Sequence, residues 1–389
     1  MTQLPIPLAI PNLGEEEKER LERCITSSFV SYIGPFVTEL EEMTAKACGA
    51  RFGVATSSGT TGLHLALISM GVKKEELVLI PSLTFIATAN AVKHCGADPI
   101  LLDVDAESWT MDPICLDNFL KEEAYQKQGR IFHRQTNRRI AAIMPVYVLG
   151  LPANMDKIRD IAKPYGLSIV ADGAAALGAK YKGRPIGDLA DLTVFSFNGN
   201  KTVTAGGGGV VVGNDPDLMS QARHLSTTAR LSGLEYIHDD IGYNYRMTNL
   251  QAAVGCAQME KLERFVEKKR TINQIYDEAF SGIKGVGLFP KPRWADSACW
   301  MSGIVLENPS FPAVITLCQK LKGEGVEAKP FWRPVHMQRP YLKSIRSALH
   351  VTENLWSKIV TLPSSTQLTQ AEQERVIGSA VKLLKEGNP

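Results

Sequence analysis

Short apolar runs alternate with amphipathic stretches over about the first 210 residues of the chain. Several of these runs contain almost no polar residue, which is typical of strands that are buried on both faces of a sheet. Strands that alternate with helices in this way predict an α/β fold in which helices cover both faces of a mostly parallel sheet. Seven strands are predicted: 52–56, 77–81, 100–104, 140–145, 168–171, 192–197 and 209–212.

Helical periodicity marks six stretches in the same part of the chain. They are residues 15–27, 40–48, 61–70, 86–95, 155–165 and 218–224. Residues 121–139 are polar and rich in Lys, Arg and Gln, so we expect them to form a solvated excursion at the surface.

The pattern changes at Thr248. Residues 250–275 predict one long helix, with Leu250, Val254, Leu262 and Phe265 on its apolar stripe. Short strands and helices follow, and the chain ends in a predicted helix at 371–385. We therefore expect a large domain over residues 1–247, with an N-terminal segment, and a linker helix with a smaller α+β domain over residues 248–389.

Composition narrows the possible partners. The net charge of the 389 residues is only +2, which gives no reason to expect a nucleic acid or an anionic membrane surface. No stretch approaches the roughly 18 to 20 apolar residues that span a bilayer, and the first residues lack the basic start of a signal peptide. The seven cysteines form no C-x-x-C pair, so we expect reduced thiols in the cytoplasm rather than a metal site or disulfides.

Lys201 is the first residue that suggests chemistry. It ends Ser196-Phe-Asn-Gly-Asn-Lys201, after an apolar run, and four glycines follow at residues 206–209. It could be a surface lysine beside a flexible loop. A Walker A motif is excluded, because Asn200 stands where that motif needs glycine. A strand follows the glycines directly, which favours a close approach of the backbone to a ligand.

Other candidates also come at predicted strand ends. Asp172 follows an apolar run and could be a helix N-cap or a buried carboxylate that faces a cation. Gly59 and Thr60 open a helix, where the turn could be a plain cap or could bind phosphate, with Ser196 as a further hydroxyl. Phe85 could be a core aromatic or a flat contact for a ring.

Taken together, these residues match the requirements of pyridoxal 5'-phosphate (PLP). PLP needs a lysine amine, a carboxylate near its pyridinium nitrogen, donors for its phosphate and a flat face for its ring. Each signal alone has a simpler explanation. Their order along the chain, each at a strand end, predicts a PLP-dependent enzyme.

At this point the sequence resembles the DegT-type sugar aminotransferases, a branch of the fold-type I PLP enzymes, over nearly its whole length. It is most similar to the legionaminic/bacillosamine-pathway branch, by Ser196-Phe-Asn-Gly-Asn-Lys201 and the polar residues 121–139. That branch acts on nucleotide-linked 4-keto-6-deoxy-hexoses. The motifs that carry the resemblance are residues 58–66, 196–201 with the glycines, 242–247 and 362–366.

The resemblance implies a fold-type I PLP-transferase and a role for each candidate. Lys201 would bond to PLP as a Schiff base, and Asp172 would pair with the pyridinium. Gly59, Thr60 and Ser196 would hold the phosphate. Asn244 would reach the PLP phosphate of a neighbouring subunit, so the active unit would be a homodimer with shared sites.

The resemblance also implies substrate contacts. Ser31, Tyr32 and Gly34 match one substrate-binding segment of the family, and Arg333 with His336 matches another. An arginine suits a nucleotide diphosphate, because its guanidinium can bind phosphate oxygens in pairs. From the residues alone, the first segment could be a turn before Pro35 and the second a surface loop.

Two departures from the family pattern concern the same pocket. Ala175 stands where relatives carry Gln or Glu, and residues 146–151 lack the His and Gln that relatives often have. The implied reaction is ping-pong transamination from L-glutamate to a nucleotide-linked keto-sugar, with Lys201 as covalent anchor and then as acid and base. The alternatives are a PLP-dependent sugar dehydratase, which would replace Lys201 by histidine, and a regulatory or binding protein with a PLP fold.

Overall fold

The computed structural model describes residues 4–307 and 309–386. Its largest sheet has the strand order β1-β11-β10-β7-β6-β2-β3, and the hairpin β4–β5 pairs beside β6. From β10 to β3 all neighbours run parallel, whereas β11 is antiparallel to both β1 and β10. The nine strands are β1 (Phe52–Thr56), β2 (Leu77–Pro81), β3 (Asp98–Leu102), β4 (Ala124–Lys127), β5 (Arg130–His133), β6 (Arg139–Ile143), β7 (Ser168–Asp172), β10 (Leu192–Ser196) and β11 (Gly209–Gly213).

All seven predicted strands are present in this mostly parallel sheet, which confirms the expected α/β class. The expectation for residues 121–139 is wrong in part, because β4 and β5 form a hairpin there. Ile131 of β5 is buried and pairs with Ile140 of β6. The three buried residues of this segment, Ala124, Ile131 and His133, stand among Lys, Arg and Gln residues, and this pattern was too weak to predict a strand.

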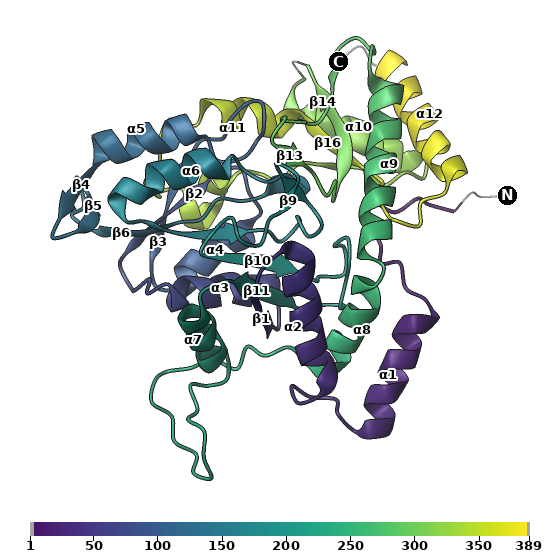
Figure 1. Ribbon diagram of the computed structural model, residues 1–389. Helices are drawn as coiled ribbons and strands as arrows, with labels where there is room; N and C mark the ends of the chain where they lie inside the picture. The colour runs from purple at the N-terminus through teal and green to yellow at the C-terminus, as the bar shows by residue number, and fades with distance from the viewer. Residues whose placement is uncertain (1–3, 308, 387–389) are drawn as a thin grey trace.

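Helices cover both faces of the large sheet (Figure 1). Along β2, Leu77 and Leu79 face one apolar layer and Val78 and Ile80 face the other, as the period of two in a strand requires. The first layer includes residues of α2, α5, α6 and α8, and the second includes residues of α3, α4 and α7. These helices are α2 (Pro35–Cys48), α3 (Gly59–Ser69), α4 (Ile86–His94), α5 (Pro113–Glu123), α6 (Met155–Ala162), α7 (Pro216–Ser226) and α8 (Asn249–Met259).

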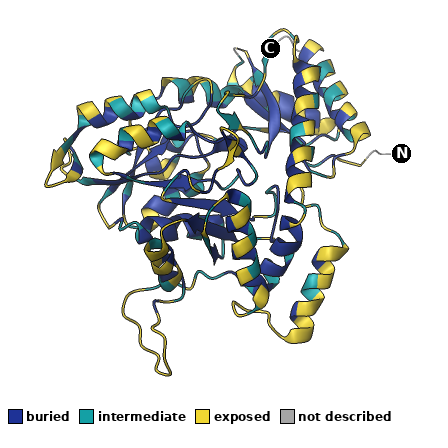
Figure 2. Cartoon of the chain, in the orientation of Figure 1, coloured by how far each residue is buried: buried dark blue, intermediate teal, exposed yellow. Residues whose placement is uncertain are grey.

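A second, antiparallel sheet has the order β12-β14-β16-β15 and packs with three helices. Figure 2 shows its central strands, β14 and β16, as largely buried, whereas the short outer strands β12 and β15 are partly exposed. A third sheet, β13-β8-β9, joins segments from both halves of the chain. The strands are β8 (Lys180–Tyr181), β9 (Arg184–Pro185), β12 (Val286–Gly287), β13 (Ala295–Asp296), β14 (Ser302–Leu306), β15 (Lys329–Pro330) and β16 (Ile359–Leu362). The helices are α9 (Leu262–Phe280), α10 (Phe311–Gly323) and α12 (Gln370–Glu386), with the shorter α11 (His350–Leu355) nearby.

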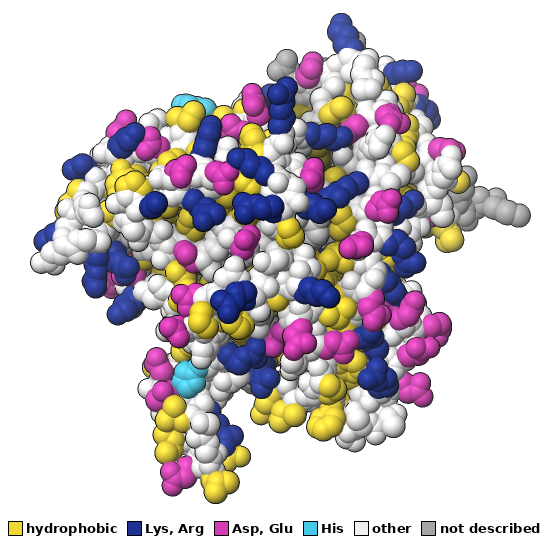
Figure 3. Space-filling model, viewed as in Figure 1, with side chains coloured by type: hydrophobic (Ala, Val, Ile, Leu, Met, Phe, Trp, Pro, Cys, Tyr) yellow, Lys and Arg dark blue, Asp and Glu magenta, His cyan; other side chains and the backbone are white. Residues whose placement is uncertain are grey.

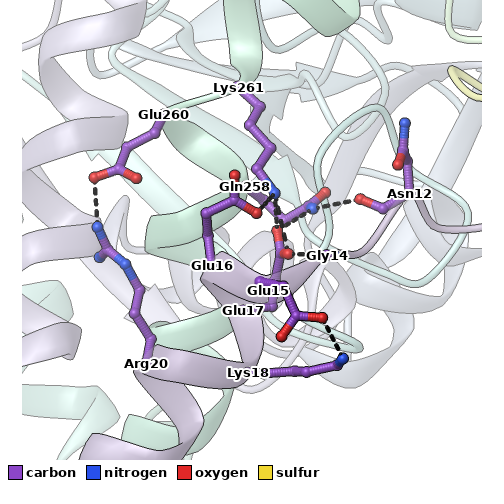
Figure 4. Close-up of polar contacts among 10 residues, drawn as sticks. All are labelled: Asn12, Gly14, Glu15, Glu16, Glu17, Lys18, Arg20, Gln258, Glu260 and Lys261. Atoms are coloured by element: carbon purple, nitrogen blue, oxygen red, sulfur yellow. Dashed lines mark hydrogen bonds and ion pairs between the residues drawn. The ribbon is translucent and has the colours of Figure 1, made fainter.

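The predicted single helix at 250–275 is wrong, because α8 and α9 are separate helices that meet at Glu260 and Lys261. The break lies where α1 (Glu15–Ser27) attaches (Figure 4). Lys261 Nζ lies 2.8 Å from Glu17 Oε1, and Gln258 Nε2 donates to the same oxygen at 2.6 Å. Apolar residues continue at helical spacing from α8 into α9, so the hydrophobic pattern gives no sign of the break. The contacts with α1 lie at the break.

The boundary expected between residues 247 and 248 stays a prediction. The helix that follows it, α8, packs against α1 and α2, and the third sheet pairs β13 with β8. Across residues 4–307 and 309–386, none of the helices combines the length and the apolar character of a membrane span.

Candidate functional site

A cavity of about 350 Å³ lies at the carboxyl ends of the strands in the large sheet. Its walls come from the turns after β1, β2 and β6 and from the last residues of β7 and β10. Open α/β sheets bind ligands at this edge, because the loops that follow parallel strands converge there. Six of the predicted cofactor residues line the cavity: Gly59, Thr60, Phe85, Asp172, Ser196 and Lys201.

Asp172 is the last residue of β7, and its side chain is only 5% exposed. Its Oδ2 accepts a hydrogen bond from Thr88 Oγ1 at 2.7 Å, and its Oδ1 accepts one from the Ala174 N–H at 3.1 Å. Burial raises the pKa of Asp172, although the two hydrogen bonds and the charge of Lys201 act against this. A cationic ring nitrogen placed against this carboxylate would stabilise its charged form.

Lys201 lies in the loop between β10 and β11, and its N–H donates to Asn198 O at 3.0 Å. Burial lowers the pKa of Lys201 to about 8, and the charge of Asp172 acts in the opposite direction. At pH 7, about a tenth of such an amine is neutral, a far larger share than for an exposed lysine. A buried lysine with a lowered pKa is a competent nucleophile toward an aldehyde.

The start of α3 forms another wall. The N-cap Ser58 accepts a hydrogen bond from the Thr61 N–H at 3.1 Å, and the first N–H groups of a helix have no carbonyl partner within it. This end of α3 can therefore bind an anion such as phosphate. Gly59 is needed here, because a Cβ at this position would lie 2.9 Å from Cβ of Ser196. The absence of that Cβ brings the Ser196 hydroxyl next to the helix end.

Aromatic side chains line the outer part of the cavity. Phe85 is 52% exposed, so it is not the core aromatic that its sequence position also allowed. Its ring lies 5.5 Å from that of Trp332, and Trp332 lies 5.9 Å from Trp300 (centroid to centroid). An amine, a buried carboxylate, a helix start with a hydroxyl and flat aromatic faces thus share one cavity, and this set fits the four requirements of PLP.

The two departures noted in the sequence lie in one wall of the cavity. Ala175 lines it beside Val148 and Leu149, so this wall offers apolar surface where an amide or carboxylate was expected. Tyr147 also contributes, but its hydroxyl is buried and has no hydrogen-bond partner among the described residues. Burial raises the pKa of Tyr147, which keeps the phenol neutral. A ligand meets few hydrogen-bonding groups on this side.

Asn244 and the N-terminal segment lie outside this cavity. Asn244 is exposed, and the carbonyl of its neighbour Tyr245 accepts a hydrogen bond from the Ser57 N–H at 2.7 Å. Ser31 and Tyr32 are exposed as well, and Tyr32 lies under the guanidinium of Arg246 at 5.0 Å.

Gly34 is held against α8. A Cβ at Gly34 would lie 2.3 Å from the side chain of Asn249, and its φ of +158° disfavours other residues. Asn249 itself donates to Phe29 O at 2.7 Å and accepts from the Phe36 N–H at 3.0 Å, so it shapes the whole N-terminal loop.

The second predicted substrate segment also lies outside the cavity, although Trp332 beside it is part of the lining. Arg333 is exposed. His336 is buried, and its Nδ1 lies 2.7 Å from Ser82 Oγ, so it connects its segment to the loop after β2. The roles of Arg333 and His336 in substrate binding stay predictions.

Several residues in or next to the cavity were missed by sequence reasoning: Thr88, Lys269, Trp300 and Trp332. Asn249, which holds the N-terminal loop outside the cavity, was missed as well. Thr88 is the third residue of α4, and its hydroxyl lies among apolar neighbours (Ile86, Ala87 and Ala89), which was a usable signal. Trp300 and Trp332 lie far beyond Lys201 in the sequence, and no local pattern connects them to it.

Comparisons with known proteins agree on one class. A model of the DegT/DnrJ/EryC1/StrS aminotransferase family matches residues 11–381. EpsN of Bacillus subtilis (strain 168), whose name proposes a pyridoxal phosphate-dependent aminotransferase, is 35% identical over 96% of this chain and 94% of its own. GDP-perosamine synthase of Caulobacter vibrioides is 32% identical over 99% of this chain and 100% of its own. A crystal structure of a DegT DnrJ EryC1 StrS aminotransferase from Brucella abortus has a TM-score of 0.85 at 28% identity, covering 95% of both chains.

Proposed function

Because the chain belongs to the DegT/DnrJ/EryC1/StrS aminotransferase family, whose members use PLP, we propose that it transfers the amino group of L-glutamate to a nucleotide-linked keto-sugar. The proposed acceptor is a 4-keto-6-deoxy-hexose. The name of the Caulobacter relative, GDP-perosamine synthase, supports a nucleotide-linked sugar. The likeness to the legionaminic/bacillosamine branch stays a prediction.

One observation carries this proposal: the Lys201 amine and the Asp172 carboxylate, from different strand ends, line one cavity with the start of α3. Lys201 would bind the aldehyde carbon of PLP. Asp172 would face the ring nitrogen, and Phe85 would cover the ring. Gly59, Thr60 and Ser196 would donate hydrogen bonds to the phosphate. The position of Ser196 beside the start of α3 supports its part in this role.

In the reaction, bound PLP supplies an electron sink for the charge that develops at the carbon losing its proton. Lys201 Nζ would take that proton from the amino-acid Cα and would then deliver it to the cofactor, so the lysine is left as it began. A pKa of about 8 suits both transfers, because the amine is able to gain and to lose a proton near neutral pH.

We further propose a homodimer. Residues 230–241, here called the arm, project from the body between α7 and α8 (Figure 1). Leu234 on the arm is fully exposed, and Tyr236 and Ile241 are largely exposed. Exposed apolar residues also occur in the N-terminal loop, at Phe29 and Ile33. Figure 3 shows hydrophobic side chains on the arm and at the lower end of this face. A second copy of the chain is the proposed cover for this apolar surface.

In a homodimer, the predicted site residues that lie outside the cavity could contact a ligand. The N-terminal loop, with Ser31, Tyr32 and Gly34, contacts the segment that follows the arm. Arg246 lies over Tyr32, and Asn249 lies against Gly34. Asn244 belongs to this second segment. In a homodimer, these residues would serve the partner's cavity, with Asn244 at the PLP phosphate. Arg333 would remain available to a nucleotide diphosphate.

The test is a panel of GDP-, UDP- and dTDP-linked keto-sugars offered with L-glutamate and read by mass spectrometry. We expect an amino-sugar product from at least one member and 2-oxoglutarate in equal amount. Lys201→Ala is the control and should give neither. Bleaching of the PLP band by glutamate without amination of any sugar would contradict the proposed acceptor class. No reaction with glutamate would instead indicate a binding or regulatory protein.

A further inference from the structure

The indole of Trp300 covers the amine of Lys201. Lys201 Nζ lies 3.8 Å from the centroid of the Trp300 ring, well within the range of about 6 Å for a cation–π interaction. Trp300 is 4% exposed, so little water competes for the amine on this side. The ring face stabilises the ammonium form of Lys201 and gives its flexible side chain a defined direction.

Three hydrogen bonds fix Trp300 in this position. Its N–H donates to Leu149 O at 3.1 Å, and its carbonyl accepts from Lys269 Nζ at 2.9 Å. Its indole Nε1–H donates to Asn200 O at 2.7 Å. Asn200 directly precedes Lys201, so the indole is attached to the same loop that carries the amine it covers.

The Lys269 amine, which donates to the Trp300 carbonyl, is buried, and this is unusual for a lysine. It lies on α9, is 2% exposed and also donates to Ser364 O. It forms no ion pair within residues 4–307 and 309–386. Burial, together with the charge of Lys201, lowers the pKa of Lys269 to about 7. A buried amine is costly, and its two bonds here fix the Trp300 and Ser364 carbonyls in place.

We propose that Trp300 is a positioning residue for Lys201, which holds the free amine on its indole face whenever this amine is not bonded to PLP. The inference rests on the proposed function, because Lys201 must leave the cofactor and return to it in every cycle. A free lysine side chain has four rotatable bonds, and its proton transfers require a defined position. The indole face holds the amine in that position. Because the ring is not basic, it does not take the proton that Lys201 transfers.

The test measures how fast cofactor-free protein captures added PLP, followed by the rise of the visible band at a series of pH values. Only the neutral amine bonds to the aldehyde, so the midpoint of the rate profile reports the ionisation of Lys201. The titratable groups that interact with Lys201 are Asp172 on β7 and Lys269 on α9, and Cys299 beside Trp300 interacts with Lys269. All of them are unchanged in the variants below.

Trp300→Leu should lower the midpoint by about half a pH unit to one unit, because the ammonium form loses the ring face. Trp300→Phe should shift it less, because an aromatic face remains. Trp332→Leu is the matched control, since it removes the same volume from the same cavity without touching the amine, and should leave the midpoint in place. In steady-state assays, Trp300→Leu should lower kcat more than it raises KM for glutamate.

An unchanged midpoint in Trp300→Leu, or an equal shift in Trp332→Leu, would overturn the inference. If Trp300→Leu does not fold, Trp300→Phe still decides, because its smaller shift must exceed that of the control. Failure of the proposed function would look different: the wild-type protein would then capture PLP no better than Lys201→Ala.

Discussion

The cavity around Lys201 and the surface around Asn244 differ in how many of their contacts come from the chain itself. The cavity collects an amine, a carboxylate, a helix start and aromatic faces from one chain, and its key side chains are buried and hydrogen-bonded. The surface exposes Tyr32, Asn244 and the apolar residues of the arm, which have few contacts of their own. One chain is therefore enough to bring the amine, the carboxylate and the helix start together, whereas the exposed residues lie outside the cavity of their own chain and would gain a site only in the proposed homodimer.

Asp172→Asn should have the largest effect, because it removes the charge at the buried end of the cavity. We expect transamination to fall by about 100- to 1,000-fold, as for the loss of a preorganised electrostatic contact to the reacting group. Steady-state rates with glutamate measure this, and the dimer should persist. Asp191→Asn is the control, since Asp191 also accepts a backbone hydrogen bond, from the Ile169 N–H at 2.8 Å, but lies outside the cavity. Equal losses in both variants would contradict the role of Asp172.

A double variant, Leu234→Asp with Ile241→Asp, probes the other side of the comparison. Two charges on the arm should weaken self-association at least tenfold, because they would be buried against a second copy. Light scattering at several concentrations measures this. The folded monomer should still capture PLP at Lys201 but should lose turnover. Ile114→Asp places a charge on another exposed apolar residue, in α5 and away from the arm, and should leave the assembly intact. A double variant that remains dimeric would locate the interface elsewhere.

Lys269→Met should change how stability depends on pH. The folded-state pKa of Lys269 is about 7 against an ordinary 10.5, so the unfolded chain binds more protons between these values and stability rises with pH in that window. Each unit contributes at most about 1.4 kcal/mol. Denaturant unfolding between pH 7 and pH 10 should show a smaller rise in the variant.

The adjacent Lys268→Met on α9, where the side chain is partly exposed, should keep the wild-type slope. If the free energy of unfolding rises with pH equally in both variants and in the wild type, the rise does not come from Lys269.

Gly34→Ala should have the smallest effect, on the N-terminal loop alone. The added Cβ would collide with Asn249 at 2.3 Å and force this side chain away from the Phe29 carbonyl. We expect a loss of about 1 to 3 kcal/mol in the free energy of unfolding and a raised KM for the sugar. Gly378→Ala in α12, where a Cβ meets open space, should be neutral or slightly stabilising. An unchanged KM would indicate that this loop does not serve a substrate site.

The sequence predicted the large sheet well because its strands are nearly continuous apolar runs such as 77–81, where local periodicity alone marks a buried strand. It failed where the decisive contact is distant. Ile131 is a strand residue because β5 pairs with both β4 and β6, and Lys261 at the helix break contacts Glu17 of α1. The hydrophobic periodicity of either segment shows none of these contacts.

The same limit applies to the site. Asp172 and Lys201 were predictable, because each stands directly after a buried strand and the fold brings strand ends together. Trp300 and Lys269 were not, because they follow from the packing of α9 and β14 against the loop that carries Lys201. Ala175 and Tyr147 were noticed only as departures, and the structure shows that they belong to one apolar wall.

The central claim is that Lys201 holds PLP and passes an amino group from glutamate to a keto-sugar. Absorbance spectra of the purified, PLP-loaded protein test it most directly. We predict that L-glutamate bleaches the visible band, that an accepted nucleotide-linked keto-sugar restores it, and that Lys201→Ala shows neither change. A band that persists in glutamate, or one that Lys201→Ala bleaches and restores as the wild type does, would contradict the account.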